Sequence, residues 1–151
     1  MATSAYLAGL QLLARRELSE SQIRQRLARR SYQSDDIDTA VARLRNERAL
    51  DDRRVATAIA RTETRVRGRG RLRVKRQIEA AGISGTLAQE AIDEVFADLD
   101  SDALLVAALD RRLRGRSAIA DDREFQRLFR YLAAQGFESD RVLALLRNKR
   151  G

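Results

Sequence analysis

The chain has 151 residues, enough for one domain or a short array of repeats. It contains no proline, cysteine or histidine, and its 30 basic and 22 acidic side chains give a net charge of +8. These absences exclude disulfides and thiol nucleophiles and remove the commonest general base and transition-metal ligands, while the positive charge indicates an acidic partner.

The basic residues are arginines, except for Lys75 and Lys149. Guanidinium groups make planar, multidentate contacts with phosphate or carboxylate, so this bias favours a partner that carries such groups. A genome rich in G and C would produce the same bias without a functional cause. Because the first residues do not form a signal peptide and no apolar stretch is long enough to span a membrane, we expect a cytoplasmic protein that makes no membrane contact.

Amphipathic patterns predict an all-α fold of about nine helices. Capping residues stand near several expected helix starts, at Ser19, Ser34, Thr86 and Ser139. Ser19 and Thr86 are each followed three residues later by a glutamine, which is the spacing of a capping box. The expected helices cover residues 4–17, 19–30, 34–48, 51–66, 70–81, 86–99, 101–114, 121–135 and 138–149.

Three segments of the chain superimpose at offsets of 51 and 54 residues. The corresponding apolar positions are Leu27, Ile78 and Leu132, then Tyr32, Ile83 and Phe137, then Ile37, Ala88 and Val142, then Val41, Ile92 and Leu146. Each segment therefore predicts a helix, a tight reversal and a second helix. At the reversal we expect Gly82 and Gly136 in the left-handed conformation that ends a helix. At Ser31, in the equivalent place, we expect either a slightly strained left-handed residue or a looser cap.

The apolar stripe of each segment is too small for a core of its own, so a third helix has to close it. This predicts an elongated row of three tandem three-helix repeats, over residues 1–50, 51–100 and 101–151. Repeats joined by short connections can exchange between chains. We therefore expect a monomer or a domain-swapped dimer.

Four segments resemble the RecX family in order and spacing, and together they cover nearly the whole chain. They are LLARRELSESQIRQRL, LRNERALDDRRVATAIART, RGRGRLRVKRQIEAAGI and FQRLFRYLAAQGF. The sequence departs from the family pattern at Val55, where an aromatic residue is usual, and at Ser31, where glycine is usual. The resemblance implies a regulator without enzymatic activity, whose partners are RecA and single- and double-stranded DNA. It further implies docking in the groove of the RecA filament and restraint of strand exchange, ATP hydrolysis and coprotease activity in DNA repair and the SOS response.

Charge is distributed unevenly along the chain. Residues Arg53 to Arg76 include ten basic side chains and one acid, whereas Gln77 to Asp110 include eight acids and no base. Such blocks indicate a binding face. Two solvated surfaces whose opposite charges neutralise each other across the repeat would give the same pattern.

On a helical wheel, three arginines of the second repeat fall together, opposite Val74 and Ile78. This stripe is Arg69, Arg73 and Arg76, and 54 residues later the third repeat has Arg123, Arg127 and Arg130. We expect both stripes to be exposed and to bind DNA or RecA without contributing to the fold. Further candidates are Arg65, Arg67, Arg71 and Lys75. Arginines that lie over the core with solvated heads are the alternative.

Other chemistry is weakly represented. Asp51 and Asp52 could hold a metal, but they also stand where a helix is expected to begin, and capping of its first amides is the expected role. Gly68 and Gly70 are not followed by the lysine of a phosphate-binding loop. We therefore expect neither cofactor nor metal. A helix-turn-helix-like or sequence-tolerant DNA-binding protein that acts independently of RecA is an alternative function, and an architectural scaffold is another.

Overall fold

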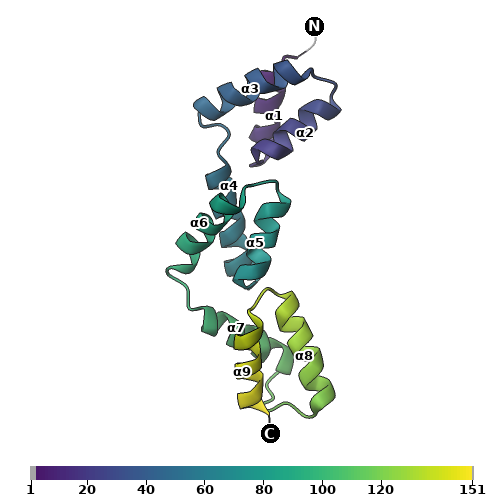
Figure 1. Cartoon of the computed structure of the whole chain (residues 1–151), viewed down its shortest axis with the longest axis vertical. Coiled ribbons are helices and arrows are strands. Elements are labelled where there is room, and N and C mark those ends of the chain that lie inside the picture. Colours follow the sequence, from purple (N-terminus) through teal and green to yellow (C-terminus); the bar gives the residue numbers. More distant parts are fainter. Residues whose placement is uncertain (1–2, 151) are drawn as a thin grey trace.

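The computed structural model describes residues 3–150, which form nine α-helices and one π-helical turn in an elongated row, as predicted (Figure 1). The first unit contains α1 (Ala5–Arg15), α2 (Glu20–Arg29) and α3 (Ser34–Asn46). The second contains α4 (Asp52–Arg61), the π turn η1 (Thr62–Val66), α5 (Arg71–Ala80) and α6 (Gly85–Phe96). The third contains α7 (Ser101–Leu113), α8 (Asp122–Ala134) and α9 (Ser139–Lys149).

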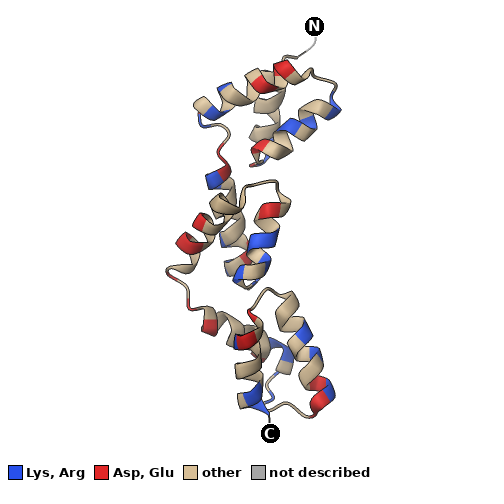
Figure 2. Cartoon of the chain, in the orientation of Figure 1, with Lys and Arg blue, Asp and Glu red and all other residues tan. Residues whose placement is uncertain are grey.

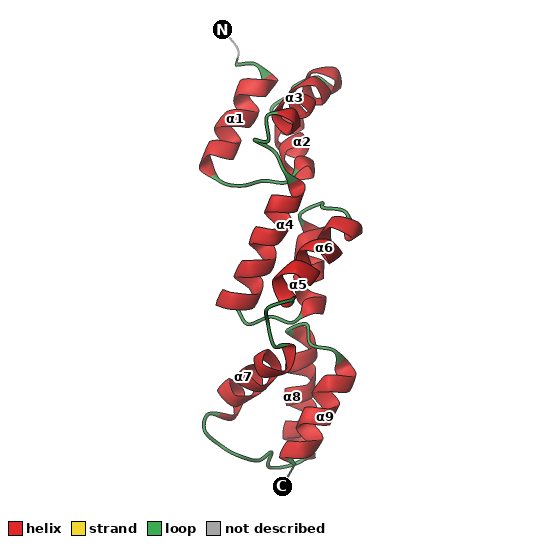
Figure 3. Ribbon diagram, turned by 90° about the vertical axis from the view of Figure 1, so that its left-hand side faces the viewer, coloured by secondary structure: helices red, strands yellow, loops and turns green. Residues whose placement is uncertain are grey.

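Each unit encloses its own cluster of buried side chains. The equivalent residues Leu27, Ile78 and Leu132 on the middle helices are 0% exposed. The first helix of each unit closes the cluster, as the small apolar stripes required, and Figure 3 shows α1, α4 and α7 on one side of the row. Buried residues from these closing helices include Leu12, Val55 and Leu109.

The helix starts agree with the sequence in part. Ser19 forms the predicted capping box, accepting a hydrogen bond from the Gln22 amide while the Gln22 side chain accepts one from the Ser19 amide. The predicted box at Thr86 is wrong, because α6 begins one residue earlier and Ser84 is its N-cap. Ser34 and Ser139 are the first residues of their helices rather than their caps.

The first helix ends at Arg15, two residues earlier than predicted. The chain is extended at Arg16, with a φ of −166°, and this carries Leu18 into the core, where it is 0% exposed. Burial of Leu18 and the cap at Ser19 therefore outweigh another turn of α1.

The three middle helices end in the predicted left-handed residue, with φ values of 69° at Ser31, 81° at Gly82 and 101° at Gly136. In the third unit the Phe137 amide donates to the Leu132 carbonyl at 3.3 Å, and the Gly136 amide donates to that of Ala133 at 3.0 Å. These are the two bonds of a Schellman motif. The Ser31 and Tyr32 amides make the equivalent bonds to Ala28 and Leu27, at 2.9 and 3.2 Å, so the first unit has the strained left-handed residue rather than a looser cap.

The middle helices α2, α5 and α8 also stack end to end. The amide of Gly70, just before α5, donates to the Gln135 carbonyl at the end of α8 at 2.9 Å, and the Leu72 amide donates to the Gly136 carbonyl at 3.0 Å. One junction along, the Ser19 hydroxyl before α2 donates to the Ala81 carbonyl at the end of α5. The positive N-termini of α2 and α5 thus lie on the negative C-termini of α5 and α8, respectively.

This stacking explains why the stop residue is glycine in two units and serine in one. A Cβ on Gly136 would lie 2.5 Å from the backbone nitrogen of Arg73, and a Cβ on Gly82 would lie 2.4 Å from the Cβ of Ser21. Ser31 ends the outermost middle helix and is exposed, so its side chain meets no stacked helix within the described chain.

Candidate functional site

The basic and acidic side chains of the second unit partly neutralise each other. Figure 2 shows acids on α6 and basic residues on α5 on different sides of this unit. Between them, Arg53 lies 2.9 Å from a carboxylate oxygen of Glu90 and 2.8 Å from one of Glu94, and Arg71 lies 3.2 Å from Asp93. The alternative of mutually neutralising surfaces therefore accounts for part of the charge block.

The arginine stripe of the third unit is exposed as expected. The side chains of Arg123, Arg127 and Arg130, on α8, are exposed to solvent. Within residues 3–150, these three guanidinium groups have no carboxylate within 4 Å. Their charge is therefore available to a partner.

In the second unit, two members of the stripe serve the fold, so the expectation of two equivalent surface stripes is wrong. Arg69 precedes α5, and its side chain is only 17% exposed and lies 3.4 Å from the carboxylate of the buried Glu63. Arg73 donates a hydrogen bond to the Ala134 carbonyl at 3.2 Å, across the junction between the second and third units. Arg76 remains exposed.

The other predicted residues also differ from one another. Arg65 in η1 is exposed. The side chain of Arg67 is also exposed, at 55%, but it lies 3.5 Å from the Glu63 carboxylate. Arg71 pairs with an acid of α6 and covers the ring of Phe96, 4.9 Å from its centroid. Lys75 is half-buried. The structure therefore does not gather the ten candidates into one uniform surface.

Three arginines that the sequence analysis overlooked lie beside the third-unit stripe. Arg111, Arg112 and Arg114, at the end of α7, line a groove of about 640 Å³ together with Arg127. The run RRLRGR at residues 111–116 was a visible signal of this groove. It was missed because the wheel compared only the middle helices, and this run lies at the end of a closing helix.

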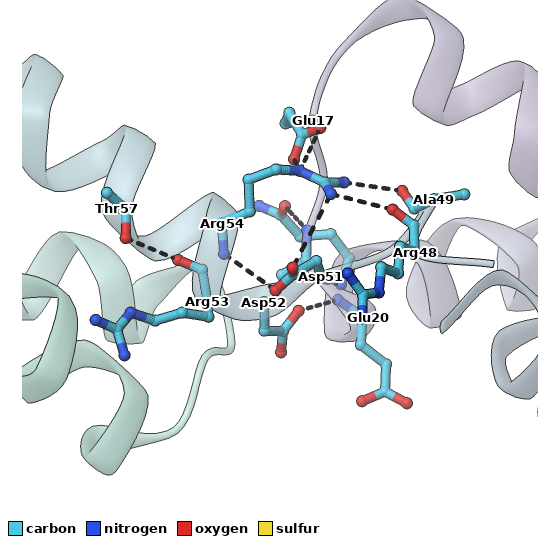
Figure 4. Close-up of polar contacts among 11 residues, drawn as sticks. Glu17, Glu20, Arg48, Ala49, Asp51, Asp52, Arg53, Arg54 and Thr57 are labelled. Atoms are coloured by element: carbon cyan, nitrogen blue, oxygen red, sulfur yellow. Dashed lines mark hydrogen bonds and ion pairs between the residues drawn. The ribbon is translucent and has the colours of Figure 1, made fainter. Parts of the chain in front are cut away.

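Asp51 and Asp52 cap two different helices (Figure 4). Asp51 accepts a hydrogen bond from the Arg54 amide in the first turn of α4, as expected. Asp52 instead accepts from the Glu20 amide at the start of α2, at 2.8 Å, so its expected role in capping α4 is corrected. Burial raises the pKa of the Asp52 carboxyl, a cost that the hydrogen bond from Glu20 partly offsets.

Arg54 of α4 also contacts the first unit. Its Nε lies 3.1 Å from both carboxylate oxygens of Glu17, and its terminal nitrogens donate to the carbonyls of Arg48 and Ala49 (Figure 4). The guanidinium group thus joins α4 to two loops of the first unit. Its role is structural, although it belongs to the basic block.

One acid of the groove, Glu124, is neutralised within the third unit. Arg116 donates hydrogen bonds of 3.0 and 2.6 Å to the two carboxylate oxygens, and the Ala120 amide donates one of 2.9 Å. These contacts, the Arg116 bonds first, lower the pKa of the Glu124 carboxyl from 4.5 to about 2. The groove therefore presents mainly positive charge.

Glu124 should contribute to the acid sensitivity of the protein. Because its pKa is lower in the folded state, the ion pair stabilises the fold above pH 4.5, and this contribution is lost as the pH falls towards about 2. We expect Glu124→Gln to lose less stability than the parent protein between neutral pH and about pH 3. Urea unfolding at both pH values measures this, with the exposed Asp110→Asn as control. An unchanged pH difference in Glu124→Gln would contradict the assignment.

The described residues include no helix long and apolar enough to cross a membrane.

Comparison with known proteins gives the relationships of the chain. A family model described as RecX, first three-helix domain, matches residues 5–44. Over 138 residues the chain is 35% identical to the regulatory protein RecX of Halorhodospira halophila. The aligned region covers 91% of this chain and 83% of the relative. It is 32% identical over 146 residues to the regulatory protein RecX of Syntrophotalea carbinolica, and this alignment covers 91% of this chain and 90% of the relative.

Solved structures share the fold. A crystal structure of RecX from Lactobacillus salivarius superimposes with a TM-score of 0.82 at 17% identity and covers 95% of this chain and 93% of its own. A second crystal structure, of a regulatory protein RecX, superimposes with a TM-score of 0.78 at 22% identity. The match covers 95% of this chain and 70% of that one. These matches confirm the all-α row of three units.

Proposed function

Because the chain belongs to the RecX family of regulatory proteins, we propose that it binds the filament that RecA forms on DNA and inhibits RecA in DNA repair and the SOS response. The inhibited activities are strand exchange, ATP hydrolysis and coprotease activity. The protein acts in the cytoplasm by binding, without catalysis, as a monomer or a domain-swapped dimer. Its partners are RecA and single- or double-stranded DNA.

The observation that carries this proposal is the exposed stripe of Arg123, Arg127 and Arg130 on an elongated row. A row of stacked units offers a long surface that can follow a filament groove. Guanidinium groups without an internal carboxylate partner gain most from phosphate or acidic side chains. Arg65 and Arg76 of the second unit are exposed as well.

RecA ATPase activity on single-stranded DNA tests the proposal. We expect sub-stoichiometric amounts of the protein to lower the rate of ATP hydrolysis, because a regulator that docks on a filament affects many RecA subunits. A heat-unfolded sample of the same protein is the control. No inhibition at any ratio would contradict the proposal and favour a DNA-binding protein that acts independently of RecA.

Binding to DNA alone separates these two functions further. If about six arginines contact phosphates, affinity should fall by roughly a decade or more between low and physiological salt and should depend little on base sequence. The aromatic residues of α8, such as Phe125 and Phe129, pack on the third cluster and are half-buried, so base stacking should contribute little. A strong preference for one duplex sequence would instead support the helix-turn-helix-like alternative.

A further inference from the structure

We propose that the groove at the end of α7, together with η1 of the second unit, binds the sugar-phosphate backbone of a nucleic acid. This inference rests on the proposed function, because it names where one of the two partners binds. It concerns a surface formed mainly by residues outside the predicted stripes. The groove residues are Arg111, Arg112, Arg114 and Arg127. At the π turn the residues are Arg65, within η1, and Arg67, which follows its last residue.

The groove brings together four guanidinium groups with little opposing charge. Its remaining lining is Glu124, which Arg116 already holds, and Leu128, which is 6% exposed. In the described part of the chain, none of the four groove arginines has a carboxylate within 4 Å. At about 640 Å³, the groove is in the size range of sites for small organic ligands, which is enough for part of a nucleic-acid strand.

The end of α7 produces this concentration of charge. Arg114 has a φ of 51°, so the chain turns sharply in the left-handed region, and Gly115 follows with a φ of 87°. The turn carries Arg114 back towards α8, where it lines the groove beside Arg127. Arg112 lies over the ring of Tyr131, 4.0 Å from its centroid, which fixes its position without neutralising it.

One of the groove arginines reaches the second unit. A Cβ on Gly68 would lie 2.9 Å from Nη2 of Arg111, so this guanidinium group rests on the loop that follows η1. Just before that loop, the π turn projects Val66, which is 78% exposed, and this residue lies between Arg65 and Arg67 in the sequence. A π turn is uncommon and is found frequently at functional sites.

The same π turn buries the side chains that hold it. Glu63 and Thr64 are 6% and 1% exposed, and the Thr64 hydroxyl donates to the Ala60 carbonyl at 2.8 Å. The Glu63 carboxylate forms an ion pair with Arg69 of the same unit. The segment is therefore anchored at its base, while its tip stays in solvent.

The composition of this surface favours a nucleic acid over a protein partner. The centre of a protein interface is apolar and poor in charged residues, whereas interfaces with nucleic acid are more polar and strongly positive. Here arginines line the groove, and its apolar lining residue, Leu128, is buried. Arginine forks match phosphate oxygens without reading bases, so the binding should be independent of sequence.

Fluorescence anisotropy with a labelled oligothymidine of about 20 nucleotides tests this site. The double variant Arg111→Gln/Arg114→Gln should bind at least about tenfold more weakly at low salt, and the slope of log K against log salt should fall by about 1.4. A second variant, Arg65→Gln/Arg67→Gln, should lower the slope by a similar amount. The control Arg15→Gln/Arg16→Gln removes the same charge from exposed arginines of the first unit and should leave the slope within error.

Circular dichroism of each variant verifies that the helices are intact, and RecA ATPase inhibition is measured alongside. Loss of oligonucleotide affinity in the groove variant but not in the control supports the inference, even if no variant affects RecA. If the groove variant binds the oligonucleotide normally but inhibits RecA less, the groove meets an acidic protein surface and the inference is overturned. A parent protein that inhibits RecA but binds no oligonucleotide overturns the inference and leaves the proposed function intact.

Discussion

Gly136→Val should lower the free energy of unfolding by roughly 2 to 5 kcal/mol, the largest stability loss expected for a single substitution here. The left-handed backbone, with its φ of 101°, accounts for about 1 to 2 kcal/mol of this loss for a residue that is not glycine. The remainder comes from the junction, where the new Cβ would lie 2.5 Å from the backbone nitrogen of Arg73. Urea unfolding monitored by circular dichroism measures the change.

Gly115→Val separates the two contributions. Gly115 also has a positive φ, of 87°, but nothing lies within 4 Å of a Cβ placed there, so this variant should lose only the backbone share. Ser31→Gly should be neutral or stabilising, because it relieves the strained φ of 69° at the exposed end of α2. Equal losses in Gly136→Val and Gly115→Val would show that the stacked junction contributes nothing.

Reversing the charge of the third-unit stripe should weaken binding without unfolding the protein. The triple variant Arg123→Glu/Arg127→Glu/Arg130→Glu replaces exposed side chains of α8. All three side chains are exposed and lie outside the buried cluster, and the acid at residue 123, in the first turn, agrees with the helix dipole, so helicity and melting should be preserved. Against phosphate or an acidic surface, attraction becomes repulsion, and affinity for DNA and for the RecA filament should fall at least about tenfold.

A matched control reverses Arg15, Arg16 and Arg30, three exposed arginines of the first unit, and so brings the same change in net charge. Gln22→Glu/Gln25→Glu should matter less still, because no stripe exists there to lose. If the α8 triple inhibits RecA as well as the parent protein does, the stripe is ordinary solvated surface. The equivalent change at Arg69, Arg73 and Arg76 is unsuitable as a test, since two of these residues hold the fold.

The repeat pattern and its glycines predicted the fold well, because the spacing of apolar residues follows the helix period and glycine is the residue that favours a left-handed backbone. Leu27, Ile78 and Leu132 align because each is the last fully buried residue of a middle helix. Gly82 and Gly136 directly follow the C-cap residue of that helix. Register and stops of this kind depend on neighbours within one unit, so a periodic pattern records them.

The roles of individual charges were predicted less well, because they depend on contacts between units. Arg73 looked equivalent to Arg127 on a helical wheel, yet the carbonyl that it contacts belongs to Ala134, in the next unit. Asp52 likewise caps α2, in the preceding unit. A wheel describes one helix in isolation and holds no information about which helix end lies against it. The groove at Arg111 depends on such a junction too, through Gly68.

The junction between α5 and α8 also sets an order in which the chain can complete its structure during synthesis. The Gly70 and Leu72 amides at the start of α5 find their acceptors on Gln135 and Gly136, about 65 residues later, whereas α8 is capped by Asp121 of its own unit. A ribosome releases the N-terminal part of a chain first. The second unit therefore emerges before the carbonyls that satisfy its middle helix exist, and it reaches its final stability only after the third unit has been made.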